Sequence, residues 1–312
     1  MFSTLLEKIS LGSPCLYRNL IVTPILLKHG RIASIEPLCL EEALAAGSFR
    51  VSEISVEGHV PELSVANVGD APVLILDGEE LVGAKQNRIV NVTILVPPRS
   101  EVVIPVTCIE AGRWGYERPG FAAAGRVLNQ GIRYRKAEAV TRSLKERKLR
   151  FSDQRAVWSE VDQMLCALGA ASPTRALSDG FENRAHAIAD YLAAFALHEG
   201  QIGIICRIGG VLAGLDLFGS ERALASAFPK LVRGSALQAL AGYTKAGLPA
   251  LDEHQLLHLA LTASADAFPA VGLGEELRID TGDIGGGALR LEGELVHLFA
   301  FVRQHTVDGG VS

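Results

Sequence analysis

A segment rich in charged and amide side chains lies between two apolar runs of this chain: Leu76-Asp-Gly-Glu-Glu-Leu-Val-Gly-Ala-Lys-Gln-Asn-Arg-Ile-Val-Asn91. The flanking runs, Pro72–Leu76 and Ile89–Val96, have the composition of β-strands. Turns between strands are usually short and made of Gly, Asn, Asp or Pro, whereas this one carries long ionic side chains. We therefore expect a ligand-binding or catalytic site at this strand junction.

Short apolar or alternating runs continue on both sides of this segment through the first 115 residues. They predict strands over Leu20–Leu27, Ile32–Leu38, Phe49–Val56, Leu63–Val68 and Glu101–Glu110, with a short helix over Glu41–Ala46. The alternation in Phe49–Val56 slips at Ser52-Glu53. Many short strands separated by Gly, Pro and Asn indicate antiparallel sheets, either a sandwich or an open barrel.

Helical periodicity begins near residue 120. Helices are predicted over Arg135–Arg147, from a Ser152 cap to Gly169, and over Asp179–Leu197, Glu221–Val232 (capped by Ser220) and Glu253–Phe268 (opened by an Asp252/Gln255 capping box). Hairpins are predicted for Ile202–Arg207 with Val211–Phe218, and for Leu277–Asp280 with Ala288–Val302 around Gly282–Gly287. The sequence therefore predicts an α+β fold, with a β-rich part over residues 1–118 and a mixed helix-and-hairpin part over residues 119–312, packed as one compact unit.

Composition narrows the class of protein. Of 312 residues, 48% are hydrophobic, which is enough for a large core and too many for a disordered chain. No run reaches the roughly 18 apolar residues of a membrane span, and Met1–Lys8 lacks a signal-peptide pattern. The five cysteines, Cys15, Cys39, Cys108, Cys166 and Cys206, form no close pair, so neither a disulfide framework nor a zinc knuckle is indicated. We expect a cytoplasmic protein.

Charge is unevenly distributed along the chain. The net charge is −5, which argues against a general nucleic-acid binder. Residues 133–155, however, hold nine Lys or Arg against three acidic residues, so the rest of the chain carries −11. This basic region is either a solvated helix face or a surface that binds phosphate groups or an acidic partner.

The polar segment offers two kinds of chemistry. On a strand, Asp77 and Glu79 would share a face while Glu80 points away. Such carboxylates bind a hard cation, act as general acid and base, or simply form an exposed acidic strand end. The positive and amide side chains that follow, Lys85, Gln86, Asn87 and Arg88, suit a phosphate, a carboxylate or a nucleobase edge. The alternative is a buried salt-bridge network that fixes the two strands.

Other residues are candidates for the same site or for separate ones. Arg113 and Trp114 follow the next strand, where they would grip a phosphate and stack on a ring, or plug the end of the sheet. His254 and His258 have the one-turn helical spacing of a weak metal pair. We expect Cys108 to be a core cysteine, and Asp216 to be a polar residue pointing inward from a strand.

Several motifs resemble one poorly characterised prokaryotic family. They are Gly78-Glu-Glu-Leu-Val-Gly-Ala-Lys-Gln-Asn-Arg88, Ile104-Pro-Val-Thr-Cys-Ile-Glu110, Gly112-Arg-Trp114, Ser152-Asp-Gln-Arg-Ala-Val-Trp158, Ser172-Pro-Thr174, Gly214-Leu-Asp-Leu-Phe218 and Val296-His-Leu-Phe-Ala-Phe301. The chain is similar, from about residue 60 to about residue 302, to the ADP-ribosylglycohydrolase- and rhodanese-phosphatase-associated protein domain family. The resemblance implies an association with enzymes of ADP-ribose and phosphate-ester metabolism, and it assigns no catalytic residue.

We therefore carry three hypotheses to the structure. In the first, the chain binds a phosphorylated nucleotide-derived ligand of the ADP-ribose type. If the chain is an enzyme, it also processes this ligand. Its site would use Lys85, Gln86, Asn87, Arg88, Arg113 and Trp114 for binding, with Glu79 and Glu80 as catalytic residues. In the second, the polar segment is a structural network in a non-enzymatic interaction module that docks an acidic partner or RNA through residues 133–155. In the third, Asp77, Glu79 and a histidine form a metal-dependent hydrolase. The sequence names no cofactor and leaves the oligomeric state open.

Overall fold

A computed structural model describes residues 1–55, 58–115, 120–242 and 251–303, and it confirms the predicted α+β class. The helices are α1 Leu5–Lys8, α2 Leu40–Ala45, α3 Gln130–Arg147, α4 Gln154–Leu168, α5 Leu177–Asn183, α6 Ala185–Ala194, α7 Glu221–Ala241 and α8 Glu253–Thr262. The strands are β1 Ile9–Leu11, β2 Cys15–Tyr17, β3 Leu20–Leu27, β4 Leu38–Cys39, β5 Phe49–Ser52, β6 Glu62–Asn67, β7 Val73–Ile75, β8 Glu79–Gly83, β9 Arg88–Val90, β10 Ile94–Val96, β11 Ser100–Cys108, β12 Phe121–Val127, β13 Gln201–Ile208, β14 Val211–Phe218, β15 Ala265–Pro269, β16 Glu275–Asp280, β17 Ile284–Leu291 and β18 Glu294–Val302.

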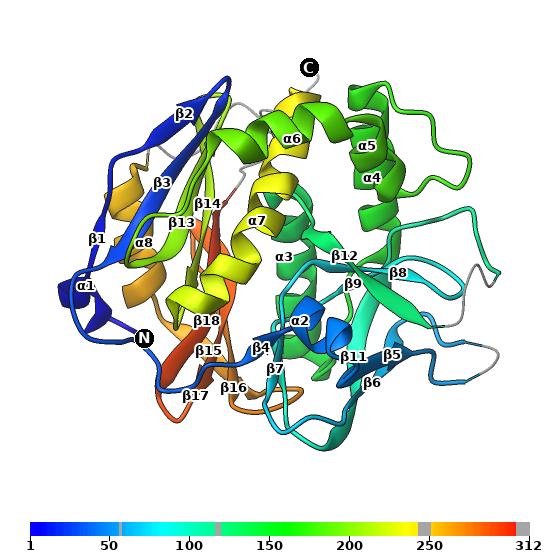
Figure 1. The fold of residues 1–312 in the computed structure, drawn as a ribbon, viewed down its shortest axis with the longest axis horizontal. Coiled ribbons are helices and arrows are strands. Elements are labelled where there is room, and N and C mark those ends of the chain that lie inside the picture. The colour runs from blue at the N-terminus through cyan, green and yellow to red at the C-terminus, as the bar shows by residue number, and fades with distance from the viewer. Residues whose placement is uncertain (56–57, 116–119, 243–250, 304–312) are drawn as a thin grey trace.

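A nine-stranded antiparallel sheet is the largest element (Figure 1). Its order is β1-β3-β13-β14-β18-β17-β16-β15, with β2 paired to β3 at one side. Strands β1 and β2 pair with β3, and β3 pairs with β13, so the sheet combines strands from both sides of residue 118.

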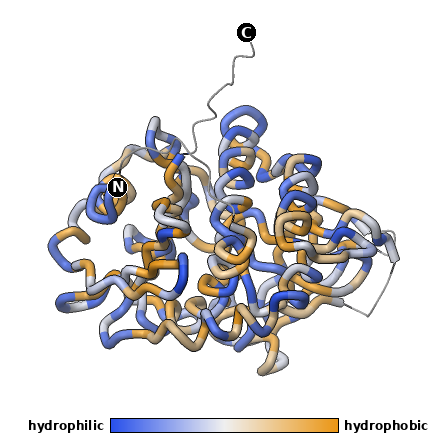
Figure 2. The backbone as a smooth tube through the Cα atoms, turned by 90° about the horizontal axis from the view of Figure 1, so that it is seen from above, coloured by the Kyte–Doolittle hydropathy of each residue, from blue (hydrophilic) through white to orange (hydrophobic). Residues whose placement is uncertain are grey.

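Both faces of this sheet are covered, which explains its apolar composition. Alternate side chains of a strand point to opposite faces, so Ile204 and Cys206 join the core beneath α7, whereas Ile205 joins the core beneath α8. Figure 1 shows α7 and α3 crossing the middle of the molecule, between the large sheet and the strands on the other side. Figure 2 shows orange and blue alternating along the helices, as expected for elements with one face against a core.

The polar segment lies in two smaller sheets on the other side of α3 and α7. One is antiparallel, in the order β12-β8-β9-β11-β6-β5, and the other has the order β10-β7-β4, with β4 and β7 parallel. A third apolar core, which includes Leu63, Ile75 and Ile104, holds these sheets together. The predicted antiparallel β-rich character of the first part is thus confirmed.

Several local predictions hold. The β13–β14 hairpin forms as expected. Helix α4 ends at Gly169, which takes the left-handed conformation with a φ of 62°. Ser220 caps α7, and Asp252 with Gln255 forms the capping box of α8.

The predicted strand over Ile32–Leu38 is wrong: only Leu38–Cys39 is a strand. Before it, the backbone N–H of Ser34 donates to the Glu294 carboxylate at 2.6 Å and not to a neighbouring strand. The predicted Ser152 cap is also wrong. Asp153 caps α4, accepting from the backbone N–H groups of Arg155 and Ala156, while Ser152 bonds to Thr107 at 2.6 Å.

The helix predicted over Asp179–Leu197 is two helices, because the backbone leaves the helical conformation at Arg184. The helix predicted over Glu253–Phe268 stops at Thr262, and Ala265–Pro269 pairs with β16 as strand β15. Each prediction extended an amphipathic pattern past the end of a helix, and in the second case the pairing with β16 overrides that pattern.

The glycine-rich Gly282–Gly287 segment is not simply a turn. Gly285, Gly286 and Gly287 lie in β17, between β16 and β18. A Cβ on Gly286 would lie 2.2 Å from the carbonyl oxygen of Phe299, so the glycine allows the two strands to approach closely.

Across the described ranges, none of the helices combines the length and apolar character that crossing a lipid bilayer requires.

Candidate functional site

The polar segment is buried, as the alternative of a buried salt-bridge network requires. Asp77, Glu79 and Arg88 are fully buried, and Lys85 is only 9% exposed. The chain turns at Gly78, with a φ of 78°, and at Ala84, with a φ of 41°. These turns pack the charged side chains against the helices between the sheets, so each charge needs a partner or a ligand.

Asp77 belongs to a buried network that joins both halves of the fold. Its carboxylate accepts from Arg133 Nε at 3.3 Å and from Lys136 Nζ at 2.5 Å. Arg133 also donates two hydrogen bonds to Asp216, at 2.8 and 2.9 Å, and Asp216 lies 3.2 Å from His297 Nε2. The network thus connects the turn before β8 with α3, β14 and β18.

The pKa values in this network follow from burial and pairing. Burial would raise the pKa of Asp216, but the Arg133 guanidinium and His297 hold it below its ordinary value. Burial lowers the pKa of Lys136 to about 8, although Asp77 opposes the shift. Asp216, noted in the sequence as an inward polar residue, is confirmed as buried.

Glu79 and Glu80 have separate cationic partners. Glu79 accepts from Lys230 Nζ at 2.5 Å and from the backbone N–H of Leu76 at 2.9 Å. Burial raises the pKa of Glu79 to about 7, because the charge of Lys230 only partly offsets the loss of water. Glu80 forms a close ion pair with Arg126. The expectation that Asp77 and Glu79 share one face is wrong, because Asp77 lies in the turn before β8, where strand alternation does not apply.

Asn87 and Arg113 meet around Glu110. Arg113 donates to the Glu110 carboxylate at 2.9 and 2.6 Å and to Asn87 Oδ1 at 3.2 Å. Burial would raise the pKa of Glu110, but hydrogen bonds from Arg113 and from the Asn87 backbone hold it below 4.5. Gln86 donates to the Glu110 carbonyl at 2.9 Å and accepts from Cys108 Sγ at 3.1 Å.

Cys108 is the core cysteine that the sequence predicted. Its side chain is fully buried, and burial raises the pKa of its thiol to about 11. The thiol is therefore protonated at neutral pH. All five cysteines of the chain are free of disulfide bonds.

Arg88 has an incomplete set of partners. Its Nη1 donates to Gln86 Oε1 at 3.2 Å, while its Nη2 lies 3.9 Å from Glu53 Oε1, too far for a hydrogen bond. Within the described part of the chain, Arg88 Nε and Nη2 and both Glu53 carboxylate oxygens are buried without hydrogen-bond partners. Burial lowers the pKa of Arg88. Trp114, half exposed, packs its ring 5.7 Å from the Arg88 guanidinium and 5.2 Å from Lys85 Nζ.

A polar cavity of about 880 Å³ opens beside β8 and α5. Asn87 and Arg113, both from the motifs that resemble the family, line this cavity. Asn87 Nδ2 lies 3.4 Å from Ser178 Oγ, which also lines it. Its ionic side chains are of both signs: Arg113 and Arg126, against Glu110, Asp179 and Glu182. The wall therefore offers guanidinium donors, carboxylate acceptors and neutral amide and hydroxyl groups together.

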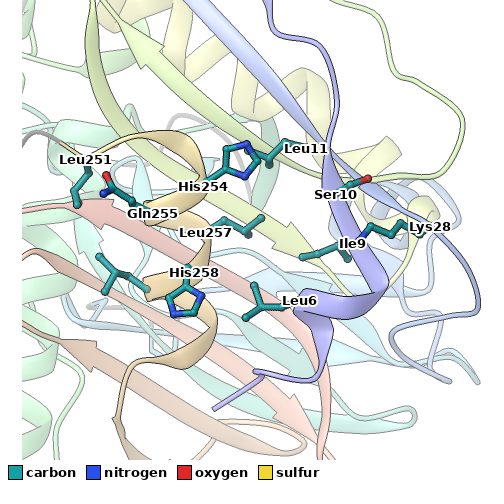
Figure 3. Close-up of a pocket in the computed structure, with 11 residues that line it drawn as sticks. Leu6, Ile9, Ser10, Leu11, Lys28, Leu251, His254, Gln255, Leu257 and His258 are labelled. Atoms are coloured by element: carbon teal, nitrogen blue, oxygen red, sulfur yellow. The ribbon is translucent and has the colours of Figure 1, made fainter.

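A second cavity, of about 750 Å³, lies between α8 and the first strand and is mostly apolar (Figure 3). Figure 3 shows His254 and His258 on α8, on the side that faces Leu6 and Leu11. Among the residues that the structure describes, no group of three or more His, Cys, Asp and Glu is placed to hold a metal ion.

The sequence missed the partners that come from distant elements. Lys230 on α7, Arg126 on β12 and Arg133 on α3 neutralise the three carboxylates of the segment. For Glu53, which lies near Arg88, the sequence did offer a signal: it is a charged residue at the slip in the alternation of Phe49–Val56.

Fold and site together define an α+β protein whose most polar segment is buried between two sheet systems and reaches, through Asn87, a polar cavity that Arg113 also lines. The chain belongs to the family described as the ARG and Rhodanese-Phosphatase-superfamily-associated Protein domain (ARPP-1), whose model matches residues 8–301. The match confirms the family resemblance and extends it over the first 50 or so residues, where the sequence offered no recognisable motif. No curated protein and no solved structure matches the chain significantly.

Proposed function

We propose that the chain binds a small phosphorylated, nucleotide-derived ligand of the ADP-ribose type in the cavity beside β8. The observation that carries the proposal is the cavity itself, of about 880 Å³, with Asn87 and Arg113 of the family motifs in its wall. This volume lies in the range of about 300–1,000 Å³ that is usual for small-molecule sites.

The lining chemistry suits both parts of such a ligand. The guanidinium groups of Arg113 and Arg126 are planar donors that match phosphate oxygens. Asp179 and Glu182 on the α5 side accept hydrogen bonds, as ribose hydroxyls require. Because each arginine also holds a carboxylate, Glu110 or Glu80, the phosphate would share these cations.

The remaining candidate residues have different positions relative to this cavity. Within the described residues, its wall does not include Lys85, Gln86, Arg88 or Trp114. Gln86 supports the wall through its hydrogen bond to the Glu110 carbonyl. Catalytic roles for Glu79 and Glu80 stay predictions, and the proposal contains no reaction step.

Isothermal titration calorimetry with ADP-ribose, NAD and AMP tests the proposal. We expect Arg113→Lys to weaken ADP-ribose binding about tenfold, because lysine keeps the positive charge but lacks the planar guanidinium that matches phosphate oxygens. Arg99→Lys is the matched control, since Arg99 is an exposed arginine that also pairs with a carboxylate, Asp70. The absence of binding heat for all three ligands, or equal affinities for wild type and Arg113→Lys, would refute the proposal. A Lys85→Ala, Arg88→Ala double variant tests the two positively charged residues among the predicted binding residues outside the described cavity wall.

The alternative of an interaction module draws support from the buried ion pairs, which are a structural network of the predicted kind. Docking of an acidic partner through residues 133–155 stays a prediction. Five basic side chains of that region already form intramolecular ion pairs: Arg133, Arg135, Lys136, Lys145 and Arg150. A polyanion would have to rely on the remaining basic side chains, and its binding would weaken steeply with salt. A cytoplasmic location also stays a prediction.

The metal-dependent hydrolase is the least supported alternative. Asp77 and Glu79 hold Arg133, Lys136 and Lys230, so their oxygens are already engaged with cationic nitrogens. Metal analysis of the purified protein is its direct test.

A further inference from the structure

Four buried polar atoms beneath Trp114 form an unusual arrangement outside the cavity wall. Arg88 presents Nε and Nη2, and Glu53 presents Oε1 and Oε2, all without hydrogen-bond partners in the described part of the chain. The Arg88 side chain is 0% exposed and the Glu53 side chain 5% exposed. Native proteins leave few buried polar groups without hydrogen bonds, and the free-energy cost is largest when the unsatisfied groups are charged.

The two groups offer complementary pairs of contacts. Nε and Nη2 are the two donors on one edge of the guanidinium, and together they can donate to two acceptor atoms of one partner. The Glu53 carboxylate offers two acceptors. Because Nη2 and Oε1 are 3.9 Å apart, the donors and acceptors lie side by side without closing onto each other.

A guanine base has the matching edge. Its N1–H and exocyclic amine donate, as a carboxylate requires, while its O6 and N7 accept from arginine in the commonest arginine–base contact. O6 and N1 are attached to one ring carbon, so their partners must lie a few ångström apart, as Nη2 and Oε1 do. A phosphate or carboxylate ligand fits less well, because its charge would face the Glu53 carboxylate.

The surroundings suit a flat ring. Trp114 is half exposed and packs against the guanidinium, so it separates Arg88 from solvent and supplies a stacking surface. Gly58 lies close on another side: a Cβ there would come within 3.2 Å of Lys85 Cδ, 3.4 Å of the Trp114 ring and 3.5 Å of Glu53 Oε2. Rotation of the indole would open the donor and acceptor edges to a ligand.

The geometry points to a guanine-recognition site in which Glu53 and Arg88 read the base edge and Trp114 stacks on the ring. This site goes beyond the proposed cavity ligand, because Glu53, Arg88 and Trp114 are not among the described residues of the cavity wall.

Tryptophan fluorescence reports the site directly. The chain has two tryptophans, so Trp158→Phe leaves Trp114 as the sole indole. Guanosine, inosine and adenosine are titrated into this variant; as nucleosides they carry no phosphate. We expect a saturable change with guanosine, about tenfold weaker binding of inosine, which lacks the exocyclic amine, and weaker binding still of adenosine, because its edge places an amine donor where Arg88 needs an acceptor.

Variants separate recognition from folding. Glu53→Gln and Arg88→Lys, made in the same background, should each weaken guanosine about 5- to 150-fold, the range of one bidentate base contact. Arg278→Lys is the control for disturbance of a buried arginine, since Arg278 is 1% exposed and bonds to Thr141 and the Ala137 carbonyl. If Arg88→Lys does not fold, the guanosine affinity of Glu53→Gln alone tests the inference.

The absence of a guanosine response, equal affinities for guanosine and adenosine, or unchanged affinity in Glu53→Gln would each overturn the inference. ADP-ribose titrated into the same variants separates the two proposals. Loss of guanosine binding with intact ADP-ribose binding supports two sites, whereas ADP-ribose binding without any guanosine response leaves only the cavity ligand.

Discussion

Replacing Arg133 with methionine tests the energetic role of the buried network. Methionine keeps an apolar stem beside Phe299 and Phe301, whose rings lie 5.4 and 5.1 Å from the guanidinium carbon. It removes the cation that holds Asp216 while leaving Asp77 with Lys136. Removing one partner of a buried ion pair costs about 3–5 kcal/mol, because the other charge stays buried without its counterion.

The loss should depend on pH in a defined direction. In the wild type, Asp216 has its pKa below 3.8, so it stays ionised from pH 5.5 to pH 8. Without Arg133, burial favours the protonated carboxyl, and proton uptake from a pKa of 3.8 costs about 1.4 kcal/mol per pH unit. The cost of protonating Asp216 therefore limits the loss of stability to about 6 kcal/mol at pH 8 and about 2 kcal/mol at pH 5.5. We therefore expect a deficit of about 3–5 kcal/mol at pH 8 and at most about 2 kcal/mol at pH 5.5.

Urea unfolding followed by circular dichroism at the two pH values measures both deficits. The control is Arg142→Met, an exposed arginine of the same helix, which should change the free energy of unfolding by less than about 0.5 kcal/mol. An equal deficit at both pH values, or a deficit below about 1 kcal/mol at pH 8, would contradict the assignment of Arg133 as the counterion of a buried carboxylate.

Three further predictions concern stability. Because burial raises the pKa of Glu79 from 4.5 to about 7, this carboxyl contributes stability below pH 4.5 that is lost as the pH rises through 7. Glu79→Gln should remove this pH-dependent part of the free energy of unfolding, which amounts to roughly 3 kcal/mol between pH 4.5 and pH 7. Parallel profiles of wild type and variant in urea unfolding would contradict the shift. The double variant Glu53→Gln, Arg88→Met removes two poorly partnered charges, so it should leave the free energy of unfolding unchanged or raise it by up to about 4 kcal/mol. The control variant Arg278→Met should lower the free energy of unfolding by about 3 kcal/mol or more. An equal loss in both variants, measured by the same assay, would show that Arg88 is adequately paired. At Gly78, with a φ of 78°, a Cβ would lie 2.9 Å from Arg133 Cγ, while at Gly242, with a φ of 66°, a Cβ would have no other described residue within 4 Å. Gly78→Ala should therefore lower the melting temperature more than Gly242→Ala, which carries only the backbone cost of about 1 kcal/mol.

Local patterns predicted local structure well. The Asp252/Gln255 box, the Ser220 cap and the Gly169 stop each depend on contacts within a few residues, and each is present. The α+β class follows from the same patterns. The sequence could not predict that β3 pairs with β13, because nothing in two apolar strands so far apart in the chain identifies them as partners.

In the candidate site, too, local features could be predicted and long-range contacts could not. The structure places Arg113 against Asn87 and Trp114 against Arg88, while a binding role for these residues stays a prediction. The partner of each carboxylate could not be predicted, because Lys230, Arg126 and Arg133 come from three elements whose placement depends on the whole fold. Strand alternation failed for Asp77 because a glycine turn, and not a strand, sets its direction.

The position of β3, between the short strands β1 and β2 on one side and β13 on the other, has a consequence for synthesis. Its residues, Leu20–Leu27, leave the ribosome well before Gln201–Ile208, the strand with which they pair over most of their length. Until then β3 has only the short strands β1 and β2 beside it, and its apolar side chains stay accessible. We expect nascent chains that end before residue 200 to be recognised by chaperones and to aggregate when released, and the sheet to assemble only after translation is nearly complete.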